Sequence, residues 1–155
     1  MCRETSADRR QFLQVTAAVL GTGLCLPALL NWLSGCVSET KQATEPSGTV
    51  ELDLSSVPEL QQVGGAVKKP FEPYNNGRNV LIIRLGQMEF VAFSVACPHA
   101  NCDVGYPTGD VIPCPCHGAQ FAVRDGRVLR GPAERPLRRF PCEYDAARNV
   151  LRITF

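Results

Sequence analysis

The sequence predicts an all-β domain, a small antiparallel β-sandwich or barrel, over residues 49–155. Short segments rich in β-branched and aromatic residues recur through this part of the chain, and turn-forming residues separate them. From Cys36 onward, no segment shows a convincing helical period. The chain is 45% hydrophobic with a formal net charge of +1, which argues against a disordered protein and gives no indication of a nucleic-acid partner.

The first 35 residues are expected to be an export signal or membrane anchor that precedes the domain. Arg9 and Arg10 stand before a run, residues 11–38, that has no charged residue, which is the layout of a secretory signal. Because Phe12 and Leu13 follow the arginine pair, the segment resembles a twin-arginine signal. That resemblance implies export of a protein that has already folded.

The end of this run, residues 33–36, reads Leu-Ser-Gly-Cys and resembles a bacterial lipobox. The resemblance implies cleavage before Cys36 and attachment of lipid to its sulfur. An uncleaved transmembrane helix is the alternative, since about 20 apolar residues span a bilayer. Both alternatives predict a domain held at the periplasmic or outer face of the bacterial cytoplasmic membrane. Residues 36–48 are mostly polar and end in Pro-Ser-Gly, so we expect a flexible tether there.

Strands are expected in five segments of the domain, and the fourth segment is expected to be a hairpin. These segments are residues 49–55, 79–85, 89–96, 120–130 and 149–155. The turn signals between and within them are residues 75–77, 86, 125–126 and 147–149. Asp125-Gly126 is expected at the tip of the hairpin.

Eight cysteines fall into two groups of odd size, so a framework made only of disulfides is not expected. The first group is Cys2, Cys25 and Cys36, and the second is Cys97, Cys102, Cys114, Cys116 and Cys142. Cys142 is predicted to be a small core residue. No role is assigned to Cys2 or Cys25.

Two short loops, residues 97–102 and 114–118, contain both histidines of the chain and four of its cysteines. Each loop offers one histidine and two cysteines as ligands. Six ligands are too many for one tetrahedral metal ion, which takes four. Cysteine and histidine suit zinc as well as iron, so an exported, zinc-stabilised binding module without a redox role is one alternative.

The two loops resemble the Rieske iron–sulfur protein family, whose pattern is Cys-x-His-x-x-Cys, a spacer and Cys-x-Cys-His-Gly. The matching residues are Cys97, His99, Cys102, Cys114, Cys116, His117 and Gly118. The resemblance implies one Rieske-type [2Fe-2S] cluster per chain. It implies that Cys97 and Cys114 bind one iron. It implies that His99 and His117 bind the other.

The resemblance also assigns the two remaining loop cysteines, because it implies a disulfide between Cys102 and Cys116 that joins the loops. A zinc site would leave these two cysteines without a reason, which favours the cluster. Residues 131–137 resemble the proline-rich loop that covers the cluster in this family. Glu134 stands where the family usually has proline, so this part of the match is incomplete.

Two positions that follow the second loop indicate whether the redox potential of the cluster is high or low. High-potential, quinol-oxidising members of the family commonly have a serine directly after Cys-His-Gly and a tyrosine two positions later. Their hydroxyls donate hydrogen bonds to sulfur and stabilise the reduced state. This chain has Ala119 and Phe121 at these positions. We therefore expect a lower potential, which suits a low-potential donor such as a menaquinol pool.

The resemblance implies one-electron transfer, and no catalysis is expected from this chain alone. The expected partners are a quinol or a b-type cytochrome subunit, and a c-type cytochrome or similar acceptor. The setting is a cytochrome bc- or b6f-like complex, another periplasmic oxidoreductase, or a free-standing tethered carrier. One candidate docking face for an acidic cytochrome or anionic lipid consists of Arg124, Arg127, Arg130, Arg135, Arg138, Arg139, Arg148 and Arg152.

Overall fold

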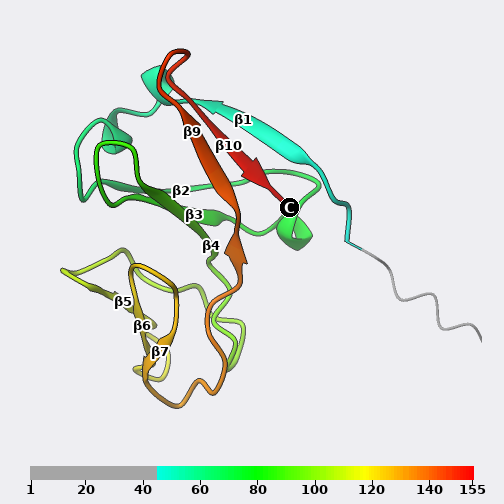
Figure 1. Cartoon of the computed structure of the whole chain (residues 1–155). Coiled ribbons are helices and arrows are strands. Elements are labelled where there is room, and N and C mark those ends of the chain that lie inside the picture. Colours follow the sequence, from blue (N-terminus) through cyan, green and yellow to red (C-terminus); the bar gives the residue numbers. More distant parts are fainter. Residues whose placement is uncertain (1–44) are drawn as a thin grey trace, which may run out of the picture. The chain divides into compact units, whose positions relative to one another are not determined.

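The computed structural model describes residues 45–155. The expected signal or anchor (1–35), the lipidation candidate Cys36 and the tether up to residue 44 lie outside the described residues. Within residues 45–155 the all-β prediction is confirmed, because ten strands form three antiparallel sheets (Figure 1). The helices of this part are three short 3-10 turns at Leu54–Ser56, Pro58–Leu60 and Asn75–Gly77. None of them is long and apolar enough to cross a membrane.

The three sheets are short and contain three, four and three strands. The first sheet has the order β1 (Thr49–Asp53), β10 (Val150–Thr154), β9 (Cys142–Asp145). The central sheet has the order β2 (Ala66–Lys69), β3 (Val80–Arg84), β4 (Phe90–Ser94), β8 (Arg139–Phe140). The third sheet has the order β5 (Val111–Pro113), β6 (Gln120–Ala122), β7 (Val128–Arg130).

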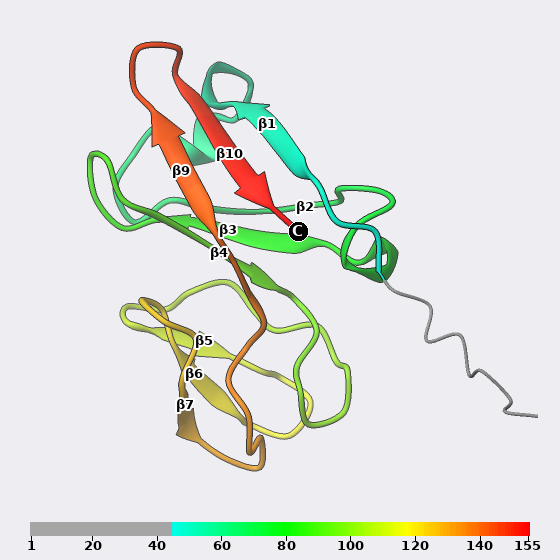
Figure 2. The same ribbon diagram turned by 45° about the vertical axis from the view of Figure 1, so that its right-hand side comes forward.

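The central sheet lies between the other two sheets, as both views show (Figures 1 and 2). Every residue of β3 and β4 is buried, which explains why these strands read as nearly continuous apolar runs. Side chains alternate between faces along a strand. Val80 and Ile82 therefore pack into the core shared with the first sheet, whereas Leu81 and Ile83 pack into a second core. That second core lies beneath the two ligand loops.

All five segments predicted as strands contain strands. β1, β3, β4 and β10 lie within four of them, and the remaining segment, residues 120–130, forms the predicted β6–β7 hairpin. Gly126, with φ of 74°, lies in its connection, and its amide donates to the Ala122 carbonyl at 2.9 Å. A Cβ atom on Gly126 would lie 2.8 Å from the ring of Phe93, so glycine is required there for space as well as for conformation. The sequence did not indicate β2, β5, β8 or β9.

Arg84 holds together two connections at one end of the central sheet. Its guanidinium donates to the carbonyls of Leu60 and Gln61 at 3.0 and 3.1 Å, and to those of Gly86 and Gln87 at 3.2 and 2.9 Å. The residue is 9% exposed. Because its donors bind neutral carbonyls, this arginine is a structural residue of the fold.

Replacing Arg84 with methionine is expected to lower the free energy of unfolding by about 2 to 4 kcal/mol, because four carbonyls lose their donor and that of Leu60 is buried. Urea unfolding followed by circular dichroism measures this loss. Arg148→Met is the matched control, since the Arg148 side chain is 52% exposed in an ion pair with Glu51. The control is expected to lose much less stability, because an ion pair between exposed side chains contributes little. Equal losses in the two variants would contradict the structural role of Arg84.

Candidate metal centre

The two ligand loops have the same backbone fold, although their sequences differ. The first loop is Cys97–Cys102, and the second loop, residues 114–118, is compared with it together with the residue that follows, Ala119. In each, the amide of the first residue donates to the carbonyl of the sixth, at 2.8 Å in the first loop and 2.7 Å in the second. The amide of the fifth residue donates back to the carbonyl of the first, at 2.8 and 3.1 Å. These paired backbone bonds close each loop.

The fifth residue of each loop adopts the left-handed conformation that this closure requires. Asn101 has φ of 56° and Gly118 has φ of 74°. Glycine and asparagine are the residues that tolerate this region best. Gly118 belongs to the sequence motif, but sequence reasoning missed the equivalent role of Asn101. The spacing of both residues, four positions after the first cysteine, was the signal available.

Gly118→Asn is expected to leave the fold stable, because Asn101 shows that asparagine suits the equivalent position. Gly118→Val is expected to lower the free energy of unfolding by about 1 to 2 kcal/mol, since a β-branched residue is strained there. A Cβ atom at this position meets nothing within 4 Å, so the loss reports the backbone and not a clash. Thermal unfolding of the two variants measures the difference. Equal melting temperatures would show that the loop does not hold this conformation.

The four expected metal ligands form two like pairs. Cys97 and Cys114 are buried, at 1% and 2% exposed, and their thiols are neighbours. His99 and His117 are exposed, with ring centroids 4.8 Å apart and planes at 83°. One pair therefore lies inside the protein and the other at its surface.

Burial raises the pKa of the Cys97 thiol. The backbone amide of His99 acts in the opposite direction, and the neighbouring Cys114 thiol raises the pKa further. Thiolate is the form that binds metal. If Cys97 and Cys114 bound a metal ion, their thiols would release protons.

The remaining two loop cysteines, Cys102 and Cys116, form a disulfide in the structure with Cα atoms 6.5 Å apart. This is the pairing that the family resemblance implied. The bond joins the sixth residue of the first loop to the third residue of the second. It keeps the two loops beside each other without using a metal ligand.

Cys142 lies away from the loops, on β9 of the first sheet. Its Sγ donates to the carbonyl of Phe90 at 3.2 Å, and burial raises the pKa of its thiol. The residue packs against the core but is only half-buried, so the prediction of a core residue is confirmed in part.

The apolar core beneath the loops keeps water from the inner side of the site. Ala119 and Phe121 are 1% and 0% exposed and belong to the core beneath the loops. Ala133 and Leu137, from the proline-containing segment 131–137, enter the same core. That segment and the first loop line a cavity of about 370 Å³, whose walls are Pro98, His99, Pro132, Glu134 and Arg135. His99 is thus open to solvent beside this segment.

The pairing of donors fits two metal centres, each bound by two like ligands. A thiol pair and an imidazole pair are the donor set of a Rieske [2Fe-2S] centre, in which two histidines replace two cysteines on one of the irons. Among residues 45–155, no three His, Cys, Asp or Glu side chains form a group suited to one metal ion.

Comparison with known proteins identifies the family of the domain. A family model described as the Rieske [2Fe-2S] domain matches residues 56–141. A cytochrome b6-f complex iron-sulfur subunit from a Synechococcus strain is 38% identical over 58 residues, which are 37% of this chain and 33% of that protein. A biphenyl dioxygenase ferredoxin subunit from a Pseudomonas strain is 36% identical over 66 residues, 41% of this chain and 60% of that protein.

A solved structure shares the fold. The soluble domain of the Rieske protein II from Sulfolobus acidocaldarius superposes with a TM-score of 0.52 at 22% identity, covering 73% of this chain and 80% of that chain. The chain matches about a third of the length of the b6-f subunit. The comparisons therefore concern the domain and not those whole proteins.

Proposed function

The chain belongs to the Rieske [2Fe-2S] domain family, and on that premise we propose that it transfers single electrons between redox partners at a membrane. The domain carries a Rieske-type [2Fe-2S] cluster. When bound, such a cluster supplies one-electron chemistry at roughly −150 to +300 mV, since neutral imidazoles replace two thiolates. Partners and location are part of the proposal, because relatives with this domain include both cytochrome b6-f subunits and dioxygenase ferredoxin subunits.

The observation that carries this proposal is the division of the four ligands into a buried thiol pair and an exposed imidazole pair. We assign Cys97 and Cys114 to one iron. We assign His99 and His117 to the other. Each pair has one member on each loop, so the disulfide that joins the loops keeps the members of each pair near each other.

The exposed imidazoles are the part of the site that a partner can touch. The buried cysteines lie against the apolar core and away from solvent. A donor and an acceptor are therefore expected to dock in turn on the surface around His99 and His117. Each imidazole also offers a ring nitrogen for a hydrogen bond with a docked quinol.

We place this carrier at the outer face of the cytoplasmic membrane, tethered through Cys36 or through an uncleaved helix. The support is the twin-arginine-like and lipobox-like sequence of residues 1–36. The proposed donor is a quinol or a b-type cytochrome subunit, and the proposed acceptor is a c-type cytochrome or similar protein. The b6-f relative supports this setting.

The test is metal analysis and low-temperature EPR of the purified full chain after reduction. The proposal predicts two irons per chain, a red-brown colour when oxidised and a Rieske-type signal when reduced. Cys114→Ala should abolish the signal, whereas Cys142→Ala should keep it, because Cys142 lies on β9 away from the loops. A colourless protein that contains zinc would support the zinc-stabilised binding module instead.

A further inference from the structure

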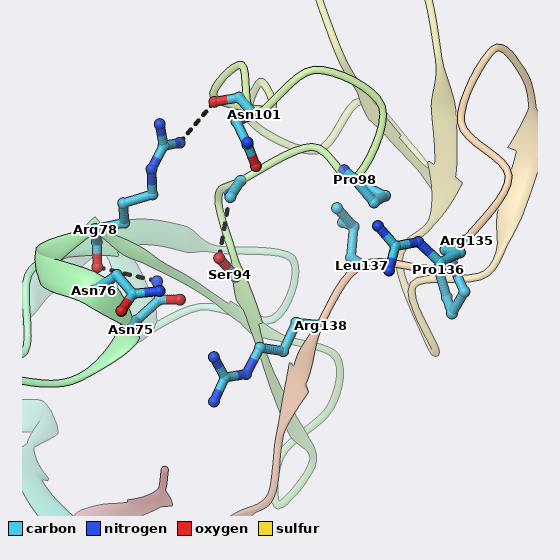
Figure 3. Close-up of a pocket in the computed structure, with 11 residues that line it drawn as sticks. Asn75, Asn76, Arg78, Ser94, Pro98, Asn101, Arg135, Pro136, Leu137 and Arg138 are labelled. Carbon is cyan, nitrogen blue, oxygen red and sulfur yellow. Dashed lines mark hydrogen bonds between the residues drawn. The ribbon is translucent and has the colours of Figure 1, made fainter. Parts of the chain in front are cut away.

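The surface has a cavity of about 600 Å³ next to the first ligand loop (Figure 3). We call it the arginine pocket. Three segments form it: the turn after β2, the end of β4 with the first loop, and the segment before β8. Its walls are Asn75, Asn76, Arg78, Ser94, Ala96, Pro98, Asn101, Arg135, Pro136, Leu137 and Arg138.

The arginine pocket is positively charged, because three of its lining residues are arginines and none is acidic. Arg78 is oriented by the carbonyl of Asn101, at 2.7 Å, and by Asp103, at 3.1 Å. Arg138 lies over the ring of Phe140, at 5.0 Å from its centroid. Among the described residues, no carboxylate lies within ion-pair distance of Arg135. The pocket therefore has the charge to bind an anion.

A carboxylate already occupies the edge of the arginine pocket. Glu45, just before β1, accepts hydrogen bonds from Arg138 and from the amide of Asn76. Both donors line the pocket, and they come from segments far apart in the chain. This contact indicates that the pocket recognises a side-chain carboxylate, for which a guanidinium fork is well suited.

The arginine pocket adjoins the exposed histidine pair. Pro98 and Arg135 line both this pocket and the cavity of about 370 Å³ that contains His99. A side chain bound by the arginines therefore brings its own protein against His99. The arginines of the pocket differ in this from Arg148 and Arg152, which pair with Glu51 on the first sheet.

We propose that the arginine pocket binds an acidic side chain of the redox partner protein, and that Glu45 occupies the edge of the site until the partner displaces it. This inference rests on the electron-transfer function proposed above and adds the chemistry of the partner. Charge complementarity of this kind accelerates encounter and orients the partner. Glu45 then competes with the partner, because both present a carboxylate to Arg138.

The test measures binding of fluorescein-labelled hexaglutamate to the cluster-loaded full chain by fluorescence anisotropy at low salt. Replacing Arg135 and Arg138 with glutamine should weaken binding about tenfold, since two ion pairs with the peptide are lost. Glu45→Gln should strengthen binding about twofold to fivefold, because Arg138 becomes free. The matched control replaces Arg124 and Arg127 with glutamine, which removes the same charge from side chains 76% and 70% exposed in the β6–β7 connection. The control should change binding less than twofold.

Three results would overturn the proposal. The first is no binding of hexaglutamate, and the second is equal weakening in the control, which would indicate a response to net charge alone. The third is binding of phosphatidylglycerol vesicles that depends on Arg135 and Arg138 while hexaglutamate binding does not, which would indicate a lipid surface. The reduced EPR signal is recorded on the same samples. If that signal is present and binding is absent, this inference fails and the electron-transfer function stands.

Discussion

Replacing Cys102 and Cys116 together with alanine is expected to lower the free energy of unfolding by about 3 kcal/mol, the value for a closed loop of this length. The two residues are 14 positions apart and bonded. Without the bond, the unfolded chain gains conformations and the two ligand loops lose their covalent connection. The variant is therefore also expected to lose its cluster faster on heating.

Urea unfolding measures the stability of this double variant, and decay of the cluster's visible absorbance at 50 °C measures cluster loss. Cys142→Ala is the control, since it removes a cysteine that packs at the edge of the other core. The control should keep the rate of cluster loss of the unmodified chain. If the double variant is as stable as the control and keeps its cluster as long, the disulfide does not support the site.

Ala119→Ser combined with Phe121→Tyr is expected to raise the midpoint potential by about 60 to 120 mV. The family resemblance implies that each new hydroxyl donates a hydrogen bond to sulfur, which stabilises the reduced state. A bond of about 1.4 kcal/mol corresponds to about 59 mV for one electron. Both positions are buried beneath the loops, so water does not compete for the hydroxyls.

Potentiometric titration of this double variant against the unmodified chain measures the shift. Ala122→Ser is the control, because Ala122 is the next residue of β6 after Phe121 and points to the opposite face. The control should titrate within about 15 mV of the unmodified chain. A double variant that titrates at the unmodified potential would show that Ala119 and Phe121 do not set it.

The strands that the sequence predicted are those with many apolar residues. β3 and β4 are buried on both faces, so their composition alone identified them. β8 has only two residues, and β5 ends in a proline, so neither has a period to read. β2 contains two lysines and has no alternation of burial, which hides its pairing with β3.

The candidate site was predictable because its ligand types cluster within two short loops. His99 and His117 are the only histidines in the chain, and both lie in those loops. The arginine pocket was not predictable in the same way. Asn76 and Arg138 are 62 positions apart, and only the fold brings them to one carboxylate. Sequence reasoning grouped Arg138 with seven other arginines, among them Arg148, which lies in an ion pair with Glu51.

The most direct test of the central claim is a potentiometric titration of the full chain followed by low-temperature EPR. A Rieske cluster bound by one thiol pair and one imidazole pair predicts a reduced-state Rieske signal. It also predicts a one-electron transition within roughly −150 to +300 mV, in the lower part of that range because Ala119 and Phe121 lack hydroxyls. A midpoint of about −400 mV would indicate a cluster with four cysteine ligands. That midpoint, or a protein with zinc and no signal, would contradict the assignment of His99 and His117 to iron.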